Sequence, residues 1–447
     1  MRSLSLNKRP TFRIGRLIGL IFLCQTILFI LVYIFFFNSL IKFINNLPGT
    51  RHLDDQDRNI TEIIESRGFQ QRTHFVQSKN GYIIQLIQII NPFVKDRSVL
   101  RPIFLQHGLE MSGSTWLLAR DGSLDENGDY YEIIDDERIE SIGSCLGFVL
   151  ASKNYDVWLG NLRGNTYSAN HTNYKSTDDL DSNYWSFSID DMIEEDLPAI
   201  IDFVLERTNS STLAYVGHSQ GSFIMLGLLS TKPIYSTRIK PFIAISPVFY
   251  LTKVDTLLGL FTSSIPGWFL RKIPTRFPLF PKFFRFYSSL CENVMFKKLC
   301  VLVMYWAFGS NSEVNFDDRI GVQMGHLMAG SSSWNIAQYL QIIANGGTPQ
   351  FLDLGDENLN LQRYGHKETL FYDASRINSS NIALIHSTGD SFNIPADVQR
   401  LKEVLSVELI DDYMINDTDF NHLDLVWSNR TGELVNERVL NILDLTL

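Results

Sequence analysis

A serine between two glycines is the residue of this sequence with the clearest potential for chemistry. Gly217-His218-Ser219-Gln220-Gly221 has the form G-x-S-x-G; it follows an apolar run at 213–216 and opens a helical stretch. The glycines permit a sharp turn that a side chain at either place would obstruct, and the turn exposes the serine at the edge of a sheet. This strand–turn–helix context predicts a nucleophile elbow, with Ser219 as the nucleophile of an acyl transfer.

The hydroxyl of such a serine needs a base to remove its proton, usually a histidine that a carboxylate orients. In folds with this elbow the chain order is serine, acid, histidine. Asp390 follows an apolar run at 382–385, and His422 lies in a loop before an amphipathic C-terminal helix. We therefore predict a Ser219–His422–Asp390 triad. His386, which falls within the strand run itself, is the alternative base.

The negative charge that develops on the ester oxygen needs two hydrogen-bond donors. We expect the backbone N–H of Gln220, directly after the nucleophile, to be one donor. The other is expected from His107-Gly108-Leu109, which ends a strand-like run at 103–105, and we assign it to the Leu109 backbone N–H. The His107 side chain is expected to organise this loop. No zinc motif, phosphate-binding loop or dinucleotide fingerprint is evident, so no metal or cofactor is expected.

Elements that could position these residues alternate along the chain. Residues 74–90 read as two strands around a tight turn at Asn80-Gly81. Continuous apolar runs, typical of strands buried on both faces of a parallel sheet, then alternate with helix-like spacing. The runs are residues 103–105, 155–159, 213–216, 242–245 and 382–385, and the helix-like stretches include 192–205 and 222–229. This rhythm predicts an α/β fold with a mostly parallel sheet flanked by helices.

The rhythm stops between residues 249 and 379, which are rich in Phe, Trp and Pro. We interpret this stretch as an inserted helical cap and assign the core to residues 55–248 and 380–447. Within the cap, residues 263–291 combine aromatic with basic side chains and contain no acid before Glu292. Such a composition suits a membrane interface or an apolar mouth. A packed cap core with solvated basic residues is the equal alternative.

The N-terminus has the features of a membrane segment. Residues 17–37 are apolar apart from Gln25 and Thr26, long enough to cross a bilayer core of roughly 30 Å, and follow a basic tail at 1–16. The run ends in three phenylalanines, a poor context for signal cleavage, so we favour a retained transmembrane helix over a cleaved signal.

The orientation of this segment stays open. The basic tail predicts a cytosolic N-terminus with the remaining chain across the membrane. Asn-X-Ser/Thr sequons are compatible with a lumenal or extracellular face and so with a glycoprotein; they begin at Asn59, Asn170, Asn209, Asn378, Asn416 and Asn429. The segment could instead enter the monolayer of a lipid droplet. The endoplasmic reticulum and the cell membrane are the other expected locations.

Bulk composition excludes some classes of function. The 447 residues carry a formal net charge of −10, which argues against a nucleic-acid partner because phosphate binding needs a basic face. The four cysteines, Cys24, Cys145, Cys291 and Cys300, are too few for a disulfide scaffold and lack zinc-ligand spacing. Cys291 and Cys300 could pair in an oxidising compartment, but we slightly favour two unpaired thiols.

Several further segments resemble the acid lipase family of α/β-hydrolases, which includes gastric lipase, lysosomal acid lipase and the fungal steryl ester hydrolases. The similarity runs from about residue 55 to the C-terminus. The matching segments are residues 106–109, 155–161, 163–168, 184–188, 196–199 and 201–203, the elbow, and Phe420-Asn421-His422-Leu423-Asp424. Two departures are an acidic insertion at 120–140 and Glu110, where the family usually has an apolar residue. The cap matches only around residues 328–332.

This resemblance implies the α/β-hydrolase fold, the same triad of Ser219, Asp390 and His422, and oxyanion donors at Leu109 and Gln220. It also implies a membrane-associated lipid esterase in lipid or sterol metabolism, a steryl ester hydrolase or a triacylglycerol lipase, whose partners are the lipid ester and a membrane or droplet surface. A catalytically silent scaffold that binds lipid or a partner is the alternative from another class. A third possibility is the same chemistry on small soluble esters.

Overall fold

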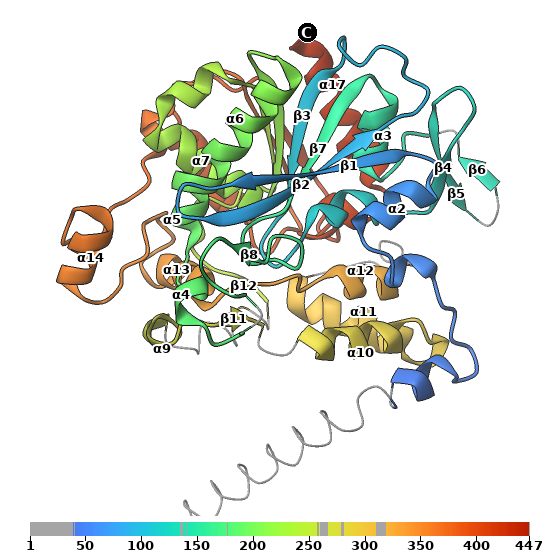
Figure 1. Cartoon of the computed structure of the whole chain (residues 1–447), viewed down its shortest axis with the longest axis horizontal. Helices are drawn as coiled ribbons and strands as arrows, with labels where there is room; N and C mark the ends of the chain where they lie inside the picture. The colour runs from blue at the N-terminus through green and yellow to red at the C-terminus, as the bar shows by residue number, and fades with distance from the viewer. Residues whose placement is uncertain are drawn as a thin grey trace, which may run out of the picture.

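The computed structural model describes residues 39, 41–134, 137–139, 141–176, 178–256, 259, 267–278, 281–309 and 319–446 (Figure 1). The transmembrane segment predicted at 17–37 lies outside these residues. Across the part of the chain that the model describes, every helix is too short or too polar to span a bilayer.

A twisted sheet organises the molecule, with strand order β1-β2-β7-β3-β9-β10-β13-β14 and β8 paired to β2. The six strands from β7 to β14 run parallel, whereas β2 is antiparallel to β1, β7 and β8. The strands are β1 Gln70–Gln77, β2 Tyr82–Ile90, β3 Arg101–Gln106, β7 Tyr155–Gly160, β8 Asn170–His171, β9 Leu213–His218, β10 Ile239–Ile245, β13 Ile382–Ser387 and β14 Asp411–Ile415.

Helices cover both faces of this sheet because the middle residues of its central strands are apolar on both faces. In β3, Ile103 and Leu105 pack into one buried cluster and Phe104 into the other, as alternating side chains of a strand must. The first cluster includes α2 Ile60–Ser66, α3 Leu146–Ser152 and α17 Glu437–Leu445; the second includes α6 Leu197–Thr208, α7 Gln220–Thr231 and α15 Pro395–Val404. Figure 1 shows α6 and α7 on one side of the sheet, and α3 and α17 on the other.

The strand predictions agree with this sheet. The runs at 103–105, 155–159, 213–216, 242–245 and 382–385 fall within β3, β7, β9, β10 and β13. The hairpin predicted at 74–90 is β1 and β2, with Gly81 at a positive φ of 95° in the turn. The helix predicted at 192–205 belongs to a longer helical stretch, α5 Ile189–Asp191, the π-helical η3 Met192–Asp196 and α6.

The acidic insertion at 120–140 contains a small antiparallel sheet, which its charge pattern did not predict. Its strands are β4 Gly122–Leu124, β5 Tyr130–Ile134 and β6 Glu137–Ile139. Glu132 of β5 is buried and accepts hydrogen bonds from the backbone N–H groups of Ser144 and Cys145, at 2.6 and 3.0 Å. The insertion is therefore fastened to the start of α3.

Residues 249–379 are here called the cap region, and their described parts fold mainly as helices at one end of the sheet (Figure 1). The helices are α9 Gly267–Lys272, α10 Pro281–Cys291, α11 Val294–Phe308, α12 Ile320–His326, α13 Ser333–Ala344 and α14 Glu357–Tyr364. Two short strands, β11 Arg276–Phe277 and β12 Ser331–Ser332, pair antiparallel. The division into a core and an inserted cap at these boundaries stays a prediction.

The remaining elements are short. They are α4 Ser182–Trp185, α16 Asp424–Trp427, η1 Asp54–Gln56, η2 Gly113–Leu117, η4 Pro233–Thr237, η5 Ala374–Arg376 and η6 Gly432–Asn436.

Cys291 and Cys300 form a disulfide, so the prediction of two unpaired thiols was wrong. The reason is the helical hairpin between them: α10 ends at Cys291, α11 begins at Val294, and the reversal brings the two Cα atoms to 5.6 Å. Cys145 is buried and free, and Cys24 lies outside the described residues.

Candidate active site

Ser219 occupies a strained turn between β9 and α7. Its φ of 55° and ψ of −115° are unfavourable for a residue with a Cβ. A Cβ on Gly217 would lie 2.6 Å from the Gly221 carbonyl carbon, and one on Gly221 would lie 2.4 Å from the Gln106 carbonyl oxygen. Both glycines of the motif are therefore required by close backbone contacts, as the sequence predicts.

The structure brings the three residues of the predicted triad together. His422 Nε2 lies 2.9 Å from Ser219 Oγ, and His422 Nδ1 lies 3.0 Å from each carboxylate oxygen of Asp390. Ser219 follows β9, Asp390 follows β13 and His422 follows β14, so all three lie at the carboxyl ends of parallel strands. This arrangement lets the imidazole take a proton from the hydroxyl while the carboxylate stabilises the resulting charge.

A second serine, which the sequence analysis missed, completes this cluster. Ser246 directly follows β10 at a positive φ of 48°. Its hydroxyl donates to Asp390 Oδ2 at 2.6 Å and lies 2.9 Å from His422 Nδ1. The only signal in the sequence is its position, since Ser246-Pro247 ends a predicted strand next to the elbow. Ser246 therefore helps to fix the position of the Asp390 carboxylate relative to the His422 ring.

His218 also contacts the base and was missed as well. Its Nε2 donates to the backbone carbonyl of His422 at 3.1 Å, and the two rings lie 4.8 Å apart. Burial, followed by the nearby His422, lowers the pKa of His218 to about 3. A neutral ring in this place positions the His422 backbone without adding a second cation beside the base.

The Asp390 carboxylate is held in its charged form. Burial alone would raise its pKa, but His422 and the hydrogen bonds that the carboxylate accepts lower the pKa to about 2. The donors include the backbone N–H groups of Phe392 and Asn393, at 2.9 and 3.0 Å. Asp390 is thus ionised at neutral pH.

The predicted oxyanion loop packs against the elbow. A Cβ on Gly108 would lie 3.1 Å from the Ser219 Cβ, so this loop touches the nucleophile directly. His107 accepts the Leu162 N–H at Nε2, so its Nδ1 carries the proton and donates to the Gly108 carbonyl at 2.7 Å. Burial lowers the pKa of His107 to about 4, which suits the organising role predicted for it.

The two residues predicted to donate to the oxyanion, Gln220 and Leu109, both lie near Ser219. Gln220 is the first residue of α7, where a backbone N–H has no partner inside the helix. Leu109 follows Gly108 and lines the same cavity as Ser219 and His422. Both residues therefore lie close to Ser219, and their assignment as oxyanion donors stays a prediction.

The alternative base has another partner. His386 lies within β13, and its Nε2 is 3.0 Å from Asp412 Oδ1. Burial lowers the pKa of His386 despite this carboxylate. His326 of the cap region also has a structural contact, with the Asp55 backbone carbonyl. Among the described residues, no cluster of three or more His, Cys, Asp or Glu side chains could hold a metal ion.

An apolar cavity of about 300 Å³ opens above the triad. Ser219 and His422 form its floor together with Leu109 and Leu423. Most of the remaining lining is aliphatic or aromatic and comes from the cap region; it includes Val254, Phe284, Phe308, Ile336, Tyr339 and Leu340. Such a cavity accepts a hydrocarbon chain and offers few groups that could hydrate it.

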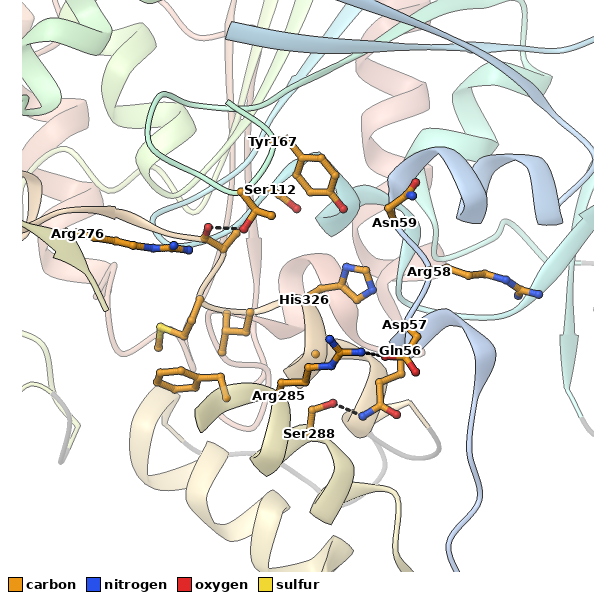
Figure 2. Close-up of a pocket in the computed structure, with 16 residues that line it drawn as sticks. Gln56, Asp57, Arg58, Asn59, Ser112, Tyr167, Arg276, Arg285, Ser288 and His326 are labelled. Atoms are coloured by element: carbon orange, nitrogen blue, oxygen red, sulfur yellow. Dashed lines mark hydrogen bonds and ion pairs between the residues drawn. The ribbon is translucent and has the colours of Figure 1, made fainter. Parts of the chain in front are cut away.

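A second cavity, of about 420 Å³, lies beside the first and is more polar (Figure 2). Its lining joins residues 56–59 to α10 and α12 of the cap region, with Tyr167 near Asn59 and Arg276 on the side away from residues 56–59. Phe284 and Met328 line both cavities, so they form part of the wall between them.

Glu110, one of the departures noted above, is buried next to the oxyanion loop. The carboxyl has no hydrogen bond of good geometry to any described residue. Burial raises its pKa well above the usual range, and the Gly330 N–H and the Arg276 guanidinium oppose this only in part. The folded chain therefore keeps a neutral acid at this position.

The Glu110→Gln variant should consequently be more stable than the wild type at pH 8 and not at pH 4. Above the ordinary glutamate pKa of 4.5 the unfolded chain releases this proton and the folded chain retains it, so wild-type stability falls as pH rises. We expect the melting temperature of the variant to exceed that of the wild type by roughly a few degrees at pH 8. Thermal unfolding at both pH values measures this difference. The exposed Glu126→Gln variant is the matched control, and a difference that is the same at both pH values would contradict the assignment.

The sequence of this chain is similar to those of known hydrolases and lipases. The family described as "alpha/beta hydrolase fold" matches residues 140–424, and the "Partial alpha/beta-hydrolase lipase region" matches residues 60–120. Gastric triacylglycerol lipase of Bos taurus is 32% identical over 393 residues, covering 86% of this chain and 91% of its own. Lipase lipl-1 of Caenorhabditis elegans and lipase member J of Homo sapiens are each 30% identical; they cover 88% and 86% of this chain and 93% and 99% of their own lengths.

A solved structure from Sulfolobus solfataricus shares the fold. Its sequence is 14% identical to this one and its TM-score is 0.50. The match covers 85% of this chain and 95% of the solved chain. At this identity the likeness concerns the fold alone.

Proposed function

Because this chain belongs to the acid lipase family of α/β-hydrolases, we propose that it is a lipid ester hydrolase acting through Ser219, His422 and Asp390. The observation that carries the proposal is the continuous set of contacts from Ser219 Oγ to His422 and on to Asp390, at the floor of an apolar cavity. Family membership alone would leave the chemistry open, since related folds also serve as scaffolds.

In the first half of the reaction, Ser219 Oγ attacks the ester carbonyl as its proton passes to His422 Nε2. The tetrahedral oxyanion accepts hydrogen bonds from the backbone N–H groups of Leu109 and Gln220. His422 then gives the proton to the departing alcohol, and an acyl-enzyme remains. In the second half, water replaces the alcohol and attacks the acyl carbonyl as His422 takes one of its protons. His422 then returns this proton to Ser219 Oγ as the bond from the acyl group to Oγ breaks, and the fatty acid leaves. Asp390 and Ser246 hold the imidazole at Nδ1, so that Nε2 faces Ser219.

For the substrate we propose a steryl ester, a triacylglycerol or both. The cavity lining supports a long acyl chain, because it is almost wholly aliphatic and aromatic. Two of the relatives above are named simply as lipases and one as a triacylglycerol lipase. These names support hydrolysis of lipid esters, but they do not identify the alcohol part of the substrate.

We further propose that the enzyme is held at a membrane by residues 17–37 and works on the oxidising side. The Cys291–Cys300 disulfide supports this side, since such bonds are rare in the cytosol. Five of the six sequon asparagines, all but Asn429, are exposed, as glycosylation requires. The basic tail before residue 17 supports a cytosolic N-terminus.

The test is a panel of esters assayed with the full-length enzyme: emulsified triolein, cholesteryl oleate and a short soluble p-nitrophenyl ester. We expect turnover of at least one lipid ester, with a steep rise in rate once the substrate forms droplets, and none with the Ser219→Ala variant. Tight lipid binding without turnover of any ester would instead favour the silent scaffold. Simple saturation by the soluble ester, with no activity on emulsions, would favour a soluble esterase.

A further inference from the structure

One face of α11 presents a row of large apolar side chains to solvent. Met295, Leu299, Leu302 and Trp306, here called the α11 stripe, are 80, 52, 40 and 46% exposed. Their spacing of four, three and four residues places them along a single helix face. A helix of a globular protein normally turns such a face inward, and the opposite face of α11 already does so with Cys300 and Met304. The stripe therefore requires a second apolar partner.

The beginning of α11 is tied to the chain that leaves the predicted membrane segment. The Val294 N–H donates to the Gly49 carbonyl at 3.1 Å, and Asn293 Nδ2 donates to Thr50 Oγ1 at 2.8 Å. Residue 41 comes only four residues after the end of the predicted 17–37 segment, a distance of at most about 14 Å. Phe43, between these points, is 62% exposed. A membrane that holds residues 17–37 must consequently lie close to this end of the helix.

The other end of α11 reaches the catalytic cavity. Phe308, its last residue, lines that cavity and stacks on Phe392 with ring centroids 5.7 Å apart. Phe392 in turn lies 4.9 Å from the His422 ring. The helix has 15 residues and so spans about 22 Å, from the entry of the predicted anchor to the cavity above the base.

The orientation of the stripe is fixed by contacts on the inner side of the hairpin. The Cys291–Cys300 disulfide joins α10 to α11. Figure 2 shows α10 fastened in turn to the chain before α2, through an ion pair of 2.8 Å between Arg285 and Asp57 and a hydrogen bond between the side chains of Gln56 and Ser288. The outward face of α11 is therefore built into the fold.

We propose that the α11 stripe lies in the headgroup layer of the phospholipid membrane that carries residues 17–37. In this position α11 is an interfacial helix, buried by about 5–10 Å, that holds the catalytic cavity against the lipid surface. The proposal rests on the proposed membrane attachment and adds the surface by which the catalytic part meets the bilayer. Competing occupants are the 17–37 segment folded back onto α11 and a second copy of this chain.

The first test measures how deeply position 302 of the α11 stripe lies in the membrane. The full-length chain with Cys24→Ser and Leu302→Cys, labelled with an environment-sensitive fluorophore, is reconstituted in phosphatidylcholine vesicles that contain nitroxide-labelled lipid. We expect strong quenching at position 302. Little quenching is expected for a label at Leu361→Cys, since Leu361 is similarly exposed, at 43%, on α14, which projects from another side of the molecule (Figure 1). A label at 302 that is water-exposed, or shielded from water without lipid quenching, would overturn the proposal.

The second test separates docking from chemistry. Leu299→Glu with Leu302→Glu places two charges on the stripe, far from the triad, and should leave hydrolysis of a soluble p-nitrophenyl ester unchanged. Hydrolysis of lipid esters within vesicles should fall by about tenfold or more, because each charge removes roughly one buried leucine from the lipid contact. Leu359→Glu with Leu361→Glu on α14 is the matched control and should change neither rate. Equal loss on vesicles for both pairs would refute the docking surface, whereas absence of all hydrolysis in the wild type would refute only the proposed function.

Discussion

Replacement of Ser219 by alanine should lower kcat for every ester by roughly 10⁶-fold, the scale seen when the nucleophile of a serine hydrolase is removed. The reason is structural: Ser219 Oγ is the atom within 2.9 Å of His422 Nε2, and alanine leaves the base with no hydroxyl to activate. Substrate binding should be nearly unchanged, because the apolar lining of the cavity remains. Steady-state hydrolysis of a soluble p-nitrophenyl ester measures the loss.

A fluorophosphonate probe provides an independent readout, since it labels only an activated serine. The wild type should be labelled and Ser219→Ala should not. Ser230→Ala makes the same substitution further along α7, where the hydroxyl bonds the Gly227 carbonyl, and it should keep both labelling and activity. If Ser219→Ala is labelled as strongly as the wild type, the nucleophile lies elsewhere.

The Asp390→Asn variant should lose about 10⁴-fold in kcat with little change in KM. An amide can replace the carboxylate in volume, but it favours the wrong imidazole tautomer and cannot stabilise the positive charge that His422 acquires. The low pKa of Asp390, about 2, indicates how strongly the native site favours the charged carboxylate. Kinetics on the soluble ester, with circular dichroism to confirm folding, test this expectation.

Two further variants test which side chains near the two histidines contribute to kcat. Ser246→Ala removes one donor to Asp390 and leaves the three triad side chains, so a loss of about tenfold is expected, as for a single net hydrogen bond. Asp412→Asn alters the carboxylate beside His386 and should leave kcat close to the wild-type value. If Asp412→Asn were as damaging as Asp390→Asn, His386 would regain its place as the candidate base.

The central sheet could be predicted from sequence because its strands are buried on both faces. Runs such as 213–216 and 382–385 are apolar at every position, and this continuity distinguishes them from surface strands. β14, at the edge, escaped prediction because Asp411 and Asp412 mask its pattern. The sheet of the acidic insertion was missed because its strands are short, at three to five residues, and lie among many acidic residues.

The candidate site could be predicted where a residue follows a strand and has a distinctive chemical role. Ser219 and Asp390 satisfied both conditions, whereas His422 was predicted from the chain order serine, acid, histidine, because the strand before it was not recognised. Ser246 did not, because a serine at a strand end is ordinary until the neighbouring strand is placed beside it. The Cys291–Cys300 bond was likewise hidden, since a spacing of nine residues permits pairing only if the chain reverses between two helices. Contacts created by tertiary structure carry no local signature.

The order of the proposed triad residues along the chain has a consequence for biosynthesis. Ser219 is made before the cap region, whereas Asp390 and His422 come after it, on loops that follow β13 and β14. β13 pairs with β10, from which the whole cap region separates it in sequence, and with β14 on its other side. A nascent or truncated polypeptide that stops inside the cap region therefore contains a serine but no means of activating it. On the proposed mechanism, hydrolysis therefore begins only after the last strands have joined the sheet.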